Sequence, residues 1–141
     1  MMAEVNAVPI DPKAVRASPE SGPCLIGGKC TTCGRTFFPY REICPSCFME
    51  GKVEEITLDP HGTLVSYTVV RRAPGREVPY AIGYILTPEN LMVFAPVVEC
   101  NFERLRQGTK MEAVFRPKRD REGHMVISYA YRPIFNAKGE T

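Results

Sequence analysis

Four cysteines within eighteen residues, Cys30, Cys33, Cys44 and Cys47, constrain this chain more than any other feature. They form two Cys-x-x-Cys knuckles separated by ten residues. Each knuckle turns two thiolates inward, and two such knuckles complete a tetrahedral site of four sulfurs. The intervening GRTFFPYREI is long enough for one strand out and one strand back. We therefore predict a metal-binding ribbon over residues 23–52.

Zinc is the metal that we expect at this site. Four sulfurs fill its coordination sphere and leave no position for water or substrate, so the predicted site is structural. A ribbon this small cannot bury a sufficient core, and a structural metal contributes about 10–16 kcal/mol of apparent free energy to such peptides. Iron is the alternative, because a rubredoxin-type centre uses the same two knuckles and carries electrons. Two disulfides or free thiols are a further alternative. Gly27-Gly28 and Gly34 are expected in turns.

Composition narrows the class of protein. The chain has 141 residues and a net charge of +2, which suits one compact domain or two very small ones. No apolar run approaches the roughly 20 residues that cross a bilayer, and the first residues lack the profile of a secretory signal. We therefore expect a cytoplasmic protein with no membrane partner. Thiols stay reduced in the cytosol, so closely spaced pairs there bind metal more often than they form disulfides.

The rest of the chain divides into an arm, a β-rich segment and a tail. Residues 1–22 are polar and contain three prolines, so we expect an arm with a short helix around Asp11–Arg16. Residues 53–135 predict the element order strand–strand–strand–helix–strand–strand, which is that of a five-stranded OB-fold barrel. Residues 136–141 are left as a C-terminal tail. The predicted fold class is mainly β with one short helix, and another small open β-sheet is the alternative.

The expected elements of the β-rich segment follow from alternation and from turn residues. A strand at 53–58 leads into the barrel. Asn101 is a plausible N-cap and Gly108 a plausible stop for the short helix. The expected barrel strands are 63–72, 80–86, 91–98, 110–117 and 124–133.

Catalytic apparatus is not evident in the remaining residues. Cys24 and Cys100 lie outside the knuckles, and Cys100 ends a predicted strand where a helix dipole would favour a thiolate. No base for it is apparent, because His61 falls in a predicted turn and His124 begins a strand. The sequence lacks Gly-x-Ser-x-Gly, phosphate-loop and dinucleotide-binding motifs. We therefore predict that this chain performs no chemistry by itself and has no catalytic residues.

Two basic stretches are candidate binding loops. Arg71, Arg72 and Arg76 share one predicted loop. Ordinary solubilising charge is one explanation, and a phosphate-bearing ligand or a nucleic-acid backbone is the other. Nucleic acid would also need exposed aromatic side chains on the barrel, although alternation buries several of the candidates. The second stretch comprises Arg116, Lys118, Arg119 and Arg121, and the aromatic candidates are Tyr67, Tyr84, Phe94, Tyr129 and Tyr131.

The runs GGKCTTCGRTFFPYREICPSC, GTLVSYTVVRR, VPYAIGYIL and LRQGTKMEAVF resemble the DUF35 family. The resemblance covers about residues 23–133 and implies a rubredoxin-like zinc ribbon followed by an OB-fold domain. By the family pattern, the metal ligands are the four knuckle cysteines. The family often has Pro-Arg where this chain has Pro39-Tyr40-Arg41, so no role is carried over to Arg41.

Members of this family commonly serve as partner subunits of thiolase-superfamily enzymes. The resemblance therefore implies a non-catalytic subunit that binds a thiolase-like partner and helps to form its acyl-CoA site, with Arg71, Arg72 and Arg76 against CoA phosphates. The short arm favours the small subunit of benzoylsuccinyl-CoA thiolase, from anaerobic toluene degradation, over partners of thiolase-like aldolases. A free-standing OB module that binds single-stranded nucleic acid is the alternative from another class, and nucleic acid is the less expected partner. An electron carrier would require iron.

Overall fold

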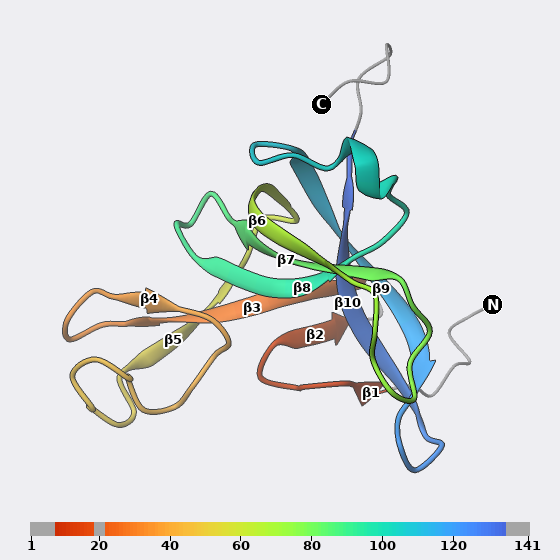
Figure 1. Ribbon diagram of the computed structural model, residues 1–141. Helices are drawn as coiled ribbons and strands as arrows, with labels where there is room; N and C mark the ends of the chain where they lie inside the picture. The colour runs from red at the N-terminus through yellow and green to blue at the C-terminus, as the bar shows by residue number, and fades with distance from the viewer. Residues whose placement is uncertain (1–7, 19–21, 135–141) are drawn as a thin grey trace. The chain divides into compact units, whose positions relative to one another are not determined.

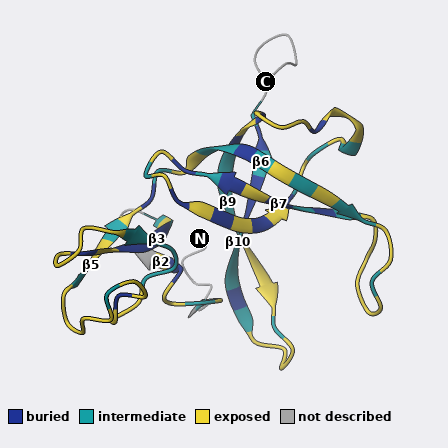
Figure 2. Cartoon of the chain, turned by 60° about the vertical axis from the view of Figure 1, so that its left-hand side comes forward, coloured by how far each residue is buried: buried dark blue, intermediate teal, exposed yellow. Residues whose placement is uncertain are grey.

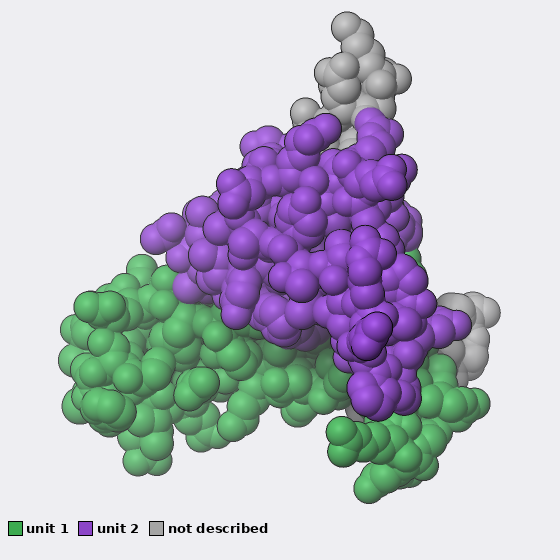
Figure 3. Space-filling view, in the orientation of Figure 1, with its two compact units in different colours: residues 1–58, 115–128 green, residues 59–114, 129–141 purple. Residues whose placement is uncertain are grey.

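The computed structural model describes residues 8–18 and 22–134 and divides the chain into two compact units. Unit 1 comprises Met1–Leu58 and Phe115–Ser128, and unit 2 comprises Asp59–Val114 and Tyr129–Thr141 (Figure 3). The two longest C-terminal strands, β9 (Lys110–Arg119) and β10 (Met125–Pro133), pass through both units (Figure 1). Within the described residues, no helix is long and apolar enough to cross a membrane.

Strand β3 (Gly22–Cys30) organises the N-terminal sheet of unit 1. It pairs antiparallel with β2, with β4 and with β5. Leu25 and Ile26 of β3 are buried and form part of the core. The shorter strands are β1 (Val8–Pro9), β2 (Val15–Ser18), β4 (Thr36–Phe37) and β5 (Val53–Thr57).

The pair Gly27-Gly28, expected in a turn, lies inside β3. Gly28 allows the neighbouring strands to approach, because a Cβ atom there would lie 2.7 Å from the ring of Phe37 and 2.8 Å from Val53 Cγ1. Glycine in a strand often marks such a close approach. The turn prediction was therefore wrong for this pair, whereas Gly34 does adopt a positive φ of 80° in the turn after β3.

The expected helix around Asp11–Arg16 is absent from the described residues, which form a turn and then β2. The Asp11 carboxylate accepts the Lys13 N–H at 3.0 Å, and the Asp11 carbonyl accepts the N–H groups of Ala14 and Val15. Such a local bond from an aspartate side chain favours a turn over a helix. Val15 is buried and pairs with Leu25, which fixes the chain as a strand. Residues 1–7 and 19–21 of the expected arm, and the tail 136–141, lie outside the described residues.

The C-terminal part forms a closed five-stranded barrel with the order β10-β8-β7-β6-β9, completed by the pairing of β9 with β10. Strands β8 and β10 are parallel, while the pairs β6–β7, β7–β8 and β6–β9 are antiparallel. This arrangement confirms the predicted OB-fold barrel. Its other strands are β6 (His61–Val70), β7 (Tyr80–Leu86) and β8 (Met92–Val97).

Burial alternates along the barrel strands, as the sequence pattern predicts. Every second residue of β8 is buried, and β7 shows the same period (Figure 2). A strand places successive side chains on opposite faces, so this alternation gives an inner and an outer face. The fully buried residues include Leu64, Ile85, Val93, Met111 and Tyr131.

Two further elements differ from the sequence expectations. The helix expected at 101–108 is only a three-residue 3-10 turn, η2 (Phe102–Arg104). Asn101 caps it as predicted, because its side chain accepts the Glu103 N–H at 3.0 Å. The turn ends early because Leu105 is buried, adopts an extended backbone and accepts a hydrogen bond from the Tyr67 hydroxyl. The strand at 53–58, expected to lead into the barrel, is β5 and pairs with β3.

Candidate metal centre

The two knuckles share one local geometry. Cys30 ends β3, and its carbonyl accepts the N–H of Gly34 at 2.8 Å. In the second knuckle, the carbonyl of Cys44 accepts the N–H of Phe48 at 2.8 Å. Gly34 and Phe48 both adopt a positive φ, of 80° and 63°. Each Cys-x-x-Cys segment is therefore folded into a tight turn by the residue four positions after its first cysteine.

These turns bring the four sulfurs together. The Sγ atoms of Cys30 and Cys47 are 3.6 Å apart, and those of Cys33 and Cys44 are 3.7 Å apart. All four Sγ atoms lie within 4.8 Å of one another. A regular tetrahedron around zinc, with Zn–S bonds of about 2.3 Å, has edges of about 3.8 Å. A disulfide would need a sulfur separation of about 2.05 Å, so the arrangement fits a metal ion and not two disulfides.

Backbone N–H groups stabilise two of the sulfurs as thiolates. Cys30 Sγ accepts the N–H of Cys33 at 3.5 Å, and this bond is the largest contribution lowering the Cys30 pKa to about 6. Cys44 Sγ accepts the N–H groups of Cys47 and Ser46 at 3.4 and 3.3 Å, and the first of these contributes most to its lowered pKa. Because a metal binds the thiolate form, these donors prepare the site for a cation.

Cys47 behaves differently. The N–H of Met49 lowers its pKa, but burial and hydrogen bonds with the sulfurs of Cys30 and Cys44 outweigh that effect and raise it to about 12. Accumulating negative charge on four adjacent sulfurs is unfavourable without a compensating cation. A bound divalent metal reverses this preference, because coordinating thiols lose their protons. The donor set therefore fits a metal of the zinc or iron type.

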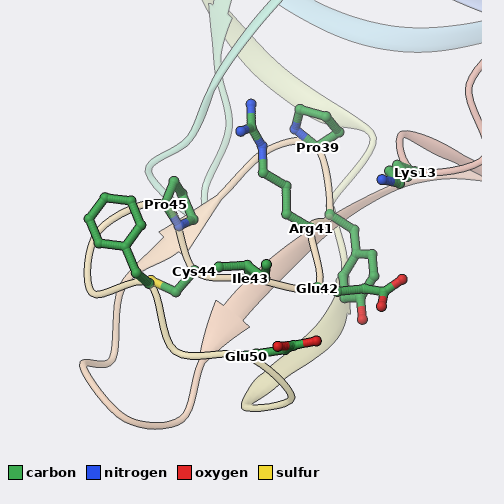
Figure 4. A pocket seen from close by; sticks show the side chains of 10 residues that line it. Lys13, Pro39, Arg41, Glu42, Ile43, Cys44, Pro45 and Glu50 are labelled. Carbon is green, nitrogen blue, oxygen red and sulfur yellow. The ribbon is translucent and has the colours of Figure 1, made fainter.

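An open groove of about 770 Å³ lies beside the second knuckle within unit 1. Arg41 and Pro39 lie at one side and Glu50 at the opposite side (Figure 4). Ile43 and Phe48 also line it, and their side chains are exposed. The sequence interpretation did not single out these two residues. The sequence did offer a clue to both, because Ile43 directly precedes the second knuckle and Phe48 directly follows it.

The three arginines proposed as ligand contacts lie in the exposed loop between β6 and β7. The guanidinium of Arg76 stacks over the Tyr80 ring, 4.4 Å from its centroid. This is a cation–π contact, which holds Arg76 against the start of β7. Arg71 and Arg72 are exposed, and their loop belongs to unit 2, whereas the cysteine cluster belongs to unit 1.

The other candidate residues are placed as follows. Burial is the main cause of the raised pKa of the Cys100 thiol, which donates to the Val97 carbonyl. His61 and His124 are exposed and lie beside Asp59 and Asp120. Two of the aromatic candidates are exposed, Tyr84 and Phe94, whereas Tyr131 is buried. Among the described residues, the cysteine cluster is thus the one site in which four ligand atoms of the same kind converge, and two of its residues, Cys30 and Cys44, are buried.

Comparison with known proteins agrees with this architecture. Residues 25–52 match the family described as "ChsH2, rubredoxin-like zinc ribbon domain", and residues 55–116 match "ChsH2, C-terminal OB-fold domain". A "DUF35 domain-containing scaffold protein" of Methanocaldococcus jannaschii is 39% identical over 118 residues, covering 80% of this chain and 84% of that protein. The "Benzoylsuccinyl-CoA thiolase subunit BbsA" of Thauera aromatica is 37% identical over 115 residues, covering 79% and 78%.

A solved structure shares the fold. The chain matches the "Ltp2-ChsH2(DUF35) aldolase" with a TM-score of 0.63 and 20% identity, covering 78% of this chain and 84% of that chain. At this identity the match supports the fold alone. The cysteine cluster, the closed barrel and the extent of identity to the curated relatives lead to one conclusion: the chain belongs to the DUF35 family of zinc-ribbon and OB-fold proteins.

Proposed function

We propose that this chain is a non-catalytic accessory subunit of a thiolase-superfamily acyl-CoA enzyme. The observation that carries the proposal is its similarity, over about four-fifths of its length, to proteins named as scaffold proteins and as a thiolase subunit. The partner supplies the catalytic residues, and this chain stabilises the complex and contributes to the acyl-CoA site.

The geometry of the cysteine cluster supports a structural role. We propose zinc as the metal, with Cys30, Cys33, Cys44 and Cys47 as its ligands. Four sulfurs at tetrahedral spacing leave no coordination position for a substrate, so zinc here stabilises the fold and takes no part in a reaction. An iron centre in the same ligands would make the protein an electron carrier, which metal analysis distinguishes at once.

The favoured enzyme is benzoylsuccinyl-CoA thiolase. Two proteins named as its BbsA subunit, from Thauera aromatica and Geobacter metallireducens, are 37% and 31% identical to this chain. The alternative is a thiolase-like aldolase partner, because the matching domain families are named after ChsH2, which also appears in the name of the solved "Ltp2-ChsH2(DUF35) aldolase". Cleavage of benzoylsuccinyl-CoA by the isolated complex with consumption of one free CoA, which yields two acyl-CoA products, would separate a thiolase partner from an aldolase partner, because an aldolase consumes no CoA.

The proposal also includes direct contact between this chain and coenzyme A. We assign it to Arg71, Arg72 and Arg76, whose loop presents three cations to a phosphate-bearing ligand. Arg76 is already stacked on Tyr80. Its side chain therefore loses less conformational entropy when a ligand binds. Replacing Arg71 and Arg72 by Ala should raise the KM for acyl-CoA in the complex and leave its assembly unchanged.

Co-expression with a thiolase-superfamily protein from the same genome tests the subunit role. The tagged chain should co-purify with that protein in near-stoichiometric amount, contain about one zinc per chain by mass spectrometry, and be required for its activity. Cys44→Ser should lose the metal and the complex, whereas the matched variant Cys100→Ala should keep both. A catalytic defect of Cys100→Ala in an intact complex, or an active partner that never binds the chain, would contradict the proposal.

A further inference from the structure

The two cysteine knuckles carry different side chains at equivalent exposed positions. These positions are the residue before the first cysteine and the two residues after the second cysteine, and all of them are exposed in both knuckles. They hold Lys29, Gly34 and Arg35 in the first knuckle and Ile43, Phe48 and Met49 in the second. The exposed fractions of Ile43, Phe48 and Met49 are 47%, 74% and 43%. The first knuckle therefore presents a polar surface, and the second an apolar one.

Phe48 has a backbone conformation that disfavours its side chain. Its φ is 63°, and that of Gly34 at the equivalent position is 80°. A residue with a Cβ atom is destabilised in this left-handed region relative to glycine. Among the described residues, Phe48 is the most exposed of the large apolar side chains, so burial within this chain offsets little of that cost. Strain that a glycine would relieve, as at Gly34, is typical of a functional site.

Phe48 and Ile43 line the open groove of about 770 Å³ beside the second knuckle, which we call the knuckle groove. All of its lining residues belong to unit 1. Ile43 forms an isolated antiparallel bridge with Glu50, which places these two residues side by side. Arg41 and Glu50 lie on opposite sides of the groove (Figure 4). The charged lining residues are two of each sign, namely Lys13, Arg41, Glu42 and Glu50.

We propose that the knuckle groove binds a protruding segment of the catalytic subunit. Because it names where that subunit docks, the assignment rests on the proposed function. The segment places an apolar side chain against Phe48 and Ile43, an acidic residue toward Arg41 and a basic residue toward Glu50. Aromatic side chains supply much of the affinity at protein interfaces, and complementary charges fix the orientation of the partner.

The charges of the knuckle groove favour a polypeptide over a phosphate-bearing occupant. Nucleic acid and CoA carry several phosphates, and the two lining carboxylates would repel them, which offsets the attraction of the two lining cations. A polypeptide segment can present both signs of charge together with apolar side chains. A second copy of this chain is less suited, because in a symmetric dimer the groove would face itself, and two concave surfaces do not fill one another.

Phe48→Gly separates affinity from stability. The change removes the ring and relieves the backbone at once, so the free variant should keep its zinc and be at least as stable in urea as the wild-type chain. Its Kd for the catalytic subunit isolated by co-purification should nevertheless rise about 10-fold or more, as measured by surface plasmon resonance. Wild-type affinity of Phe48→Gly in a stable complex would overturn the docking site and leave the proposed function standing.

Charge reversal tests the orientation of the partner segment. Arg41→Glu should raise the Kd about 10-fold, because it places a third carboxylate where an acidic partner residue is expected. Arg35→Glu is the matched control and should leave the Kd unchanged. Arg35 is exposed at the first knuckle of the same ribbon and is not among the residues that line the groove. Equal losses of affinity for both variants would show a general attraction between the two proteins and would overturn docking at the groove.

Other occupants give distinct results. If another part of the same chain covers the ring, Phe48→Ala will lower the urea midpoint of the free chain. If a second copy occupies the groove, the free chain will be a dimer by light scattering and Phe48→Gly will be a monomer. If CoA occupies it, the free chain will bind CoA and Phe48→Gly will lose that binding. Each of these results would overturn the assignment to the catalytic subunit. Failure of the wild-type chain to form any complex would reject the proposed function, and the docking site with it.

Discussion

The two cysteine knuckles share one backbone conformation but have different residues, a glycine and a phenylalanine, at the position that closes the turn. Gly34 and Phe48 occupy equivalent positions, both donate to the carbonyl of a knuckle cysteine, and both have a positive φ. Glycine adopts this conformation freely, whereas a residue with a Cβ atom loses about 1–2 kcal/mol there. Phe48 is also 74% exposed, so little burial offsets that cost within this chain.

Phe48→Gly should therefore raise the free energy of unfolding of the metal-bound chain by about 1 kcal/mol. Phe48→Ala is the control, because it removes the ring but keeps the Cβ atom. Urea denaturation monitored by circular dichroism measures both. Equal stabilities for the Gly and Ala variants would show that the left-handed backbone of Phe48 costs nothing.

Asp120 gives a second prediction at the scale of one residue. Its carboxylate accepts the N–H groups of His124 and Glu122 at 2.8 and 2.9 Å, and the first of these contributes most to lowering the pKa of Asp120 from its ordinary value. A carboxyl whose pKa is lower in the folded state stabilises that state above its unfolded pKa. This contribution is lost as the pH falls through the folded value.

Asp120→Ala should therefore destabilise the turn between β9 and β10 at neutral pH, and the difference from wild type should shrink as the pH falls below about 4. Urea denaturation at pH 7 and pH 3 provides the measurement. Glu122→Ala is the control, since its exposed carboxylate accepts no backbone N–H among the described residues. A difference that is independent of pH would contradict the role of the carboxylate.

At the scale of elements, β3 shows how a glycine fixes the spacing of a sheet. Gly28 pairs with Phe37 of β4 and with Glu55 of β5, and a side chain there would meet Phe37 and Val53. The sheet that supports the first knuckle thus depends on a position without a Cβ atom.

Gly28→Ala should lower the free energy of unfolding of the metal-bound chain by about 1–3 kcal/mol, because the added methyl overpacks the site. Lys29→Ala, at the exposed neighbouring position, should change it by less than about 0.5 kcal/mol. Chemical denaturation of both variants decides the matter. A neutral Gly28→Ala would mean that Phe37 and Val53 move apart at little cost.

At the scale of the whole molecule, the cysteine cluster belongs to unit 1, whereas most of the barrel core belongs to unit 2. The barrel core includes the apolar residues Leu64, Ile85, Val93 and Met111. We therefore expect two separable kinds of stabilisation: the proposed metal ion held by four sulfurs, and apolar side chains buried within the barrel.

Removal of the metal by a chelator should release the ribbon first. Amide exchange should accelerate at least about tenfold in β3–β5 and in both knuckles, because a structural metal supplies most of the stability of so small a module. The amides of β7 should keep much of their protection. Equal loss of protection throughout the chain would show that the metal and the barrel fold as one unit.

The sequence by itself determined the cysteine cluster and the inner faces of the barrel strands. The cysteines lie three residues apart within each knuckle, and alternation along a strand depends only on the chain's own geometry, so both are local. Tertiary structure decided what nonlocal contacts control. It placed Gly28 inside a strand against Phe37, shortened the helix after Asn101 by burying Leu105, and paired β5 with β3.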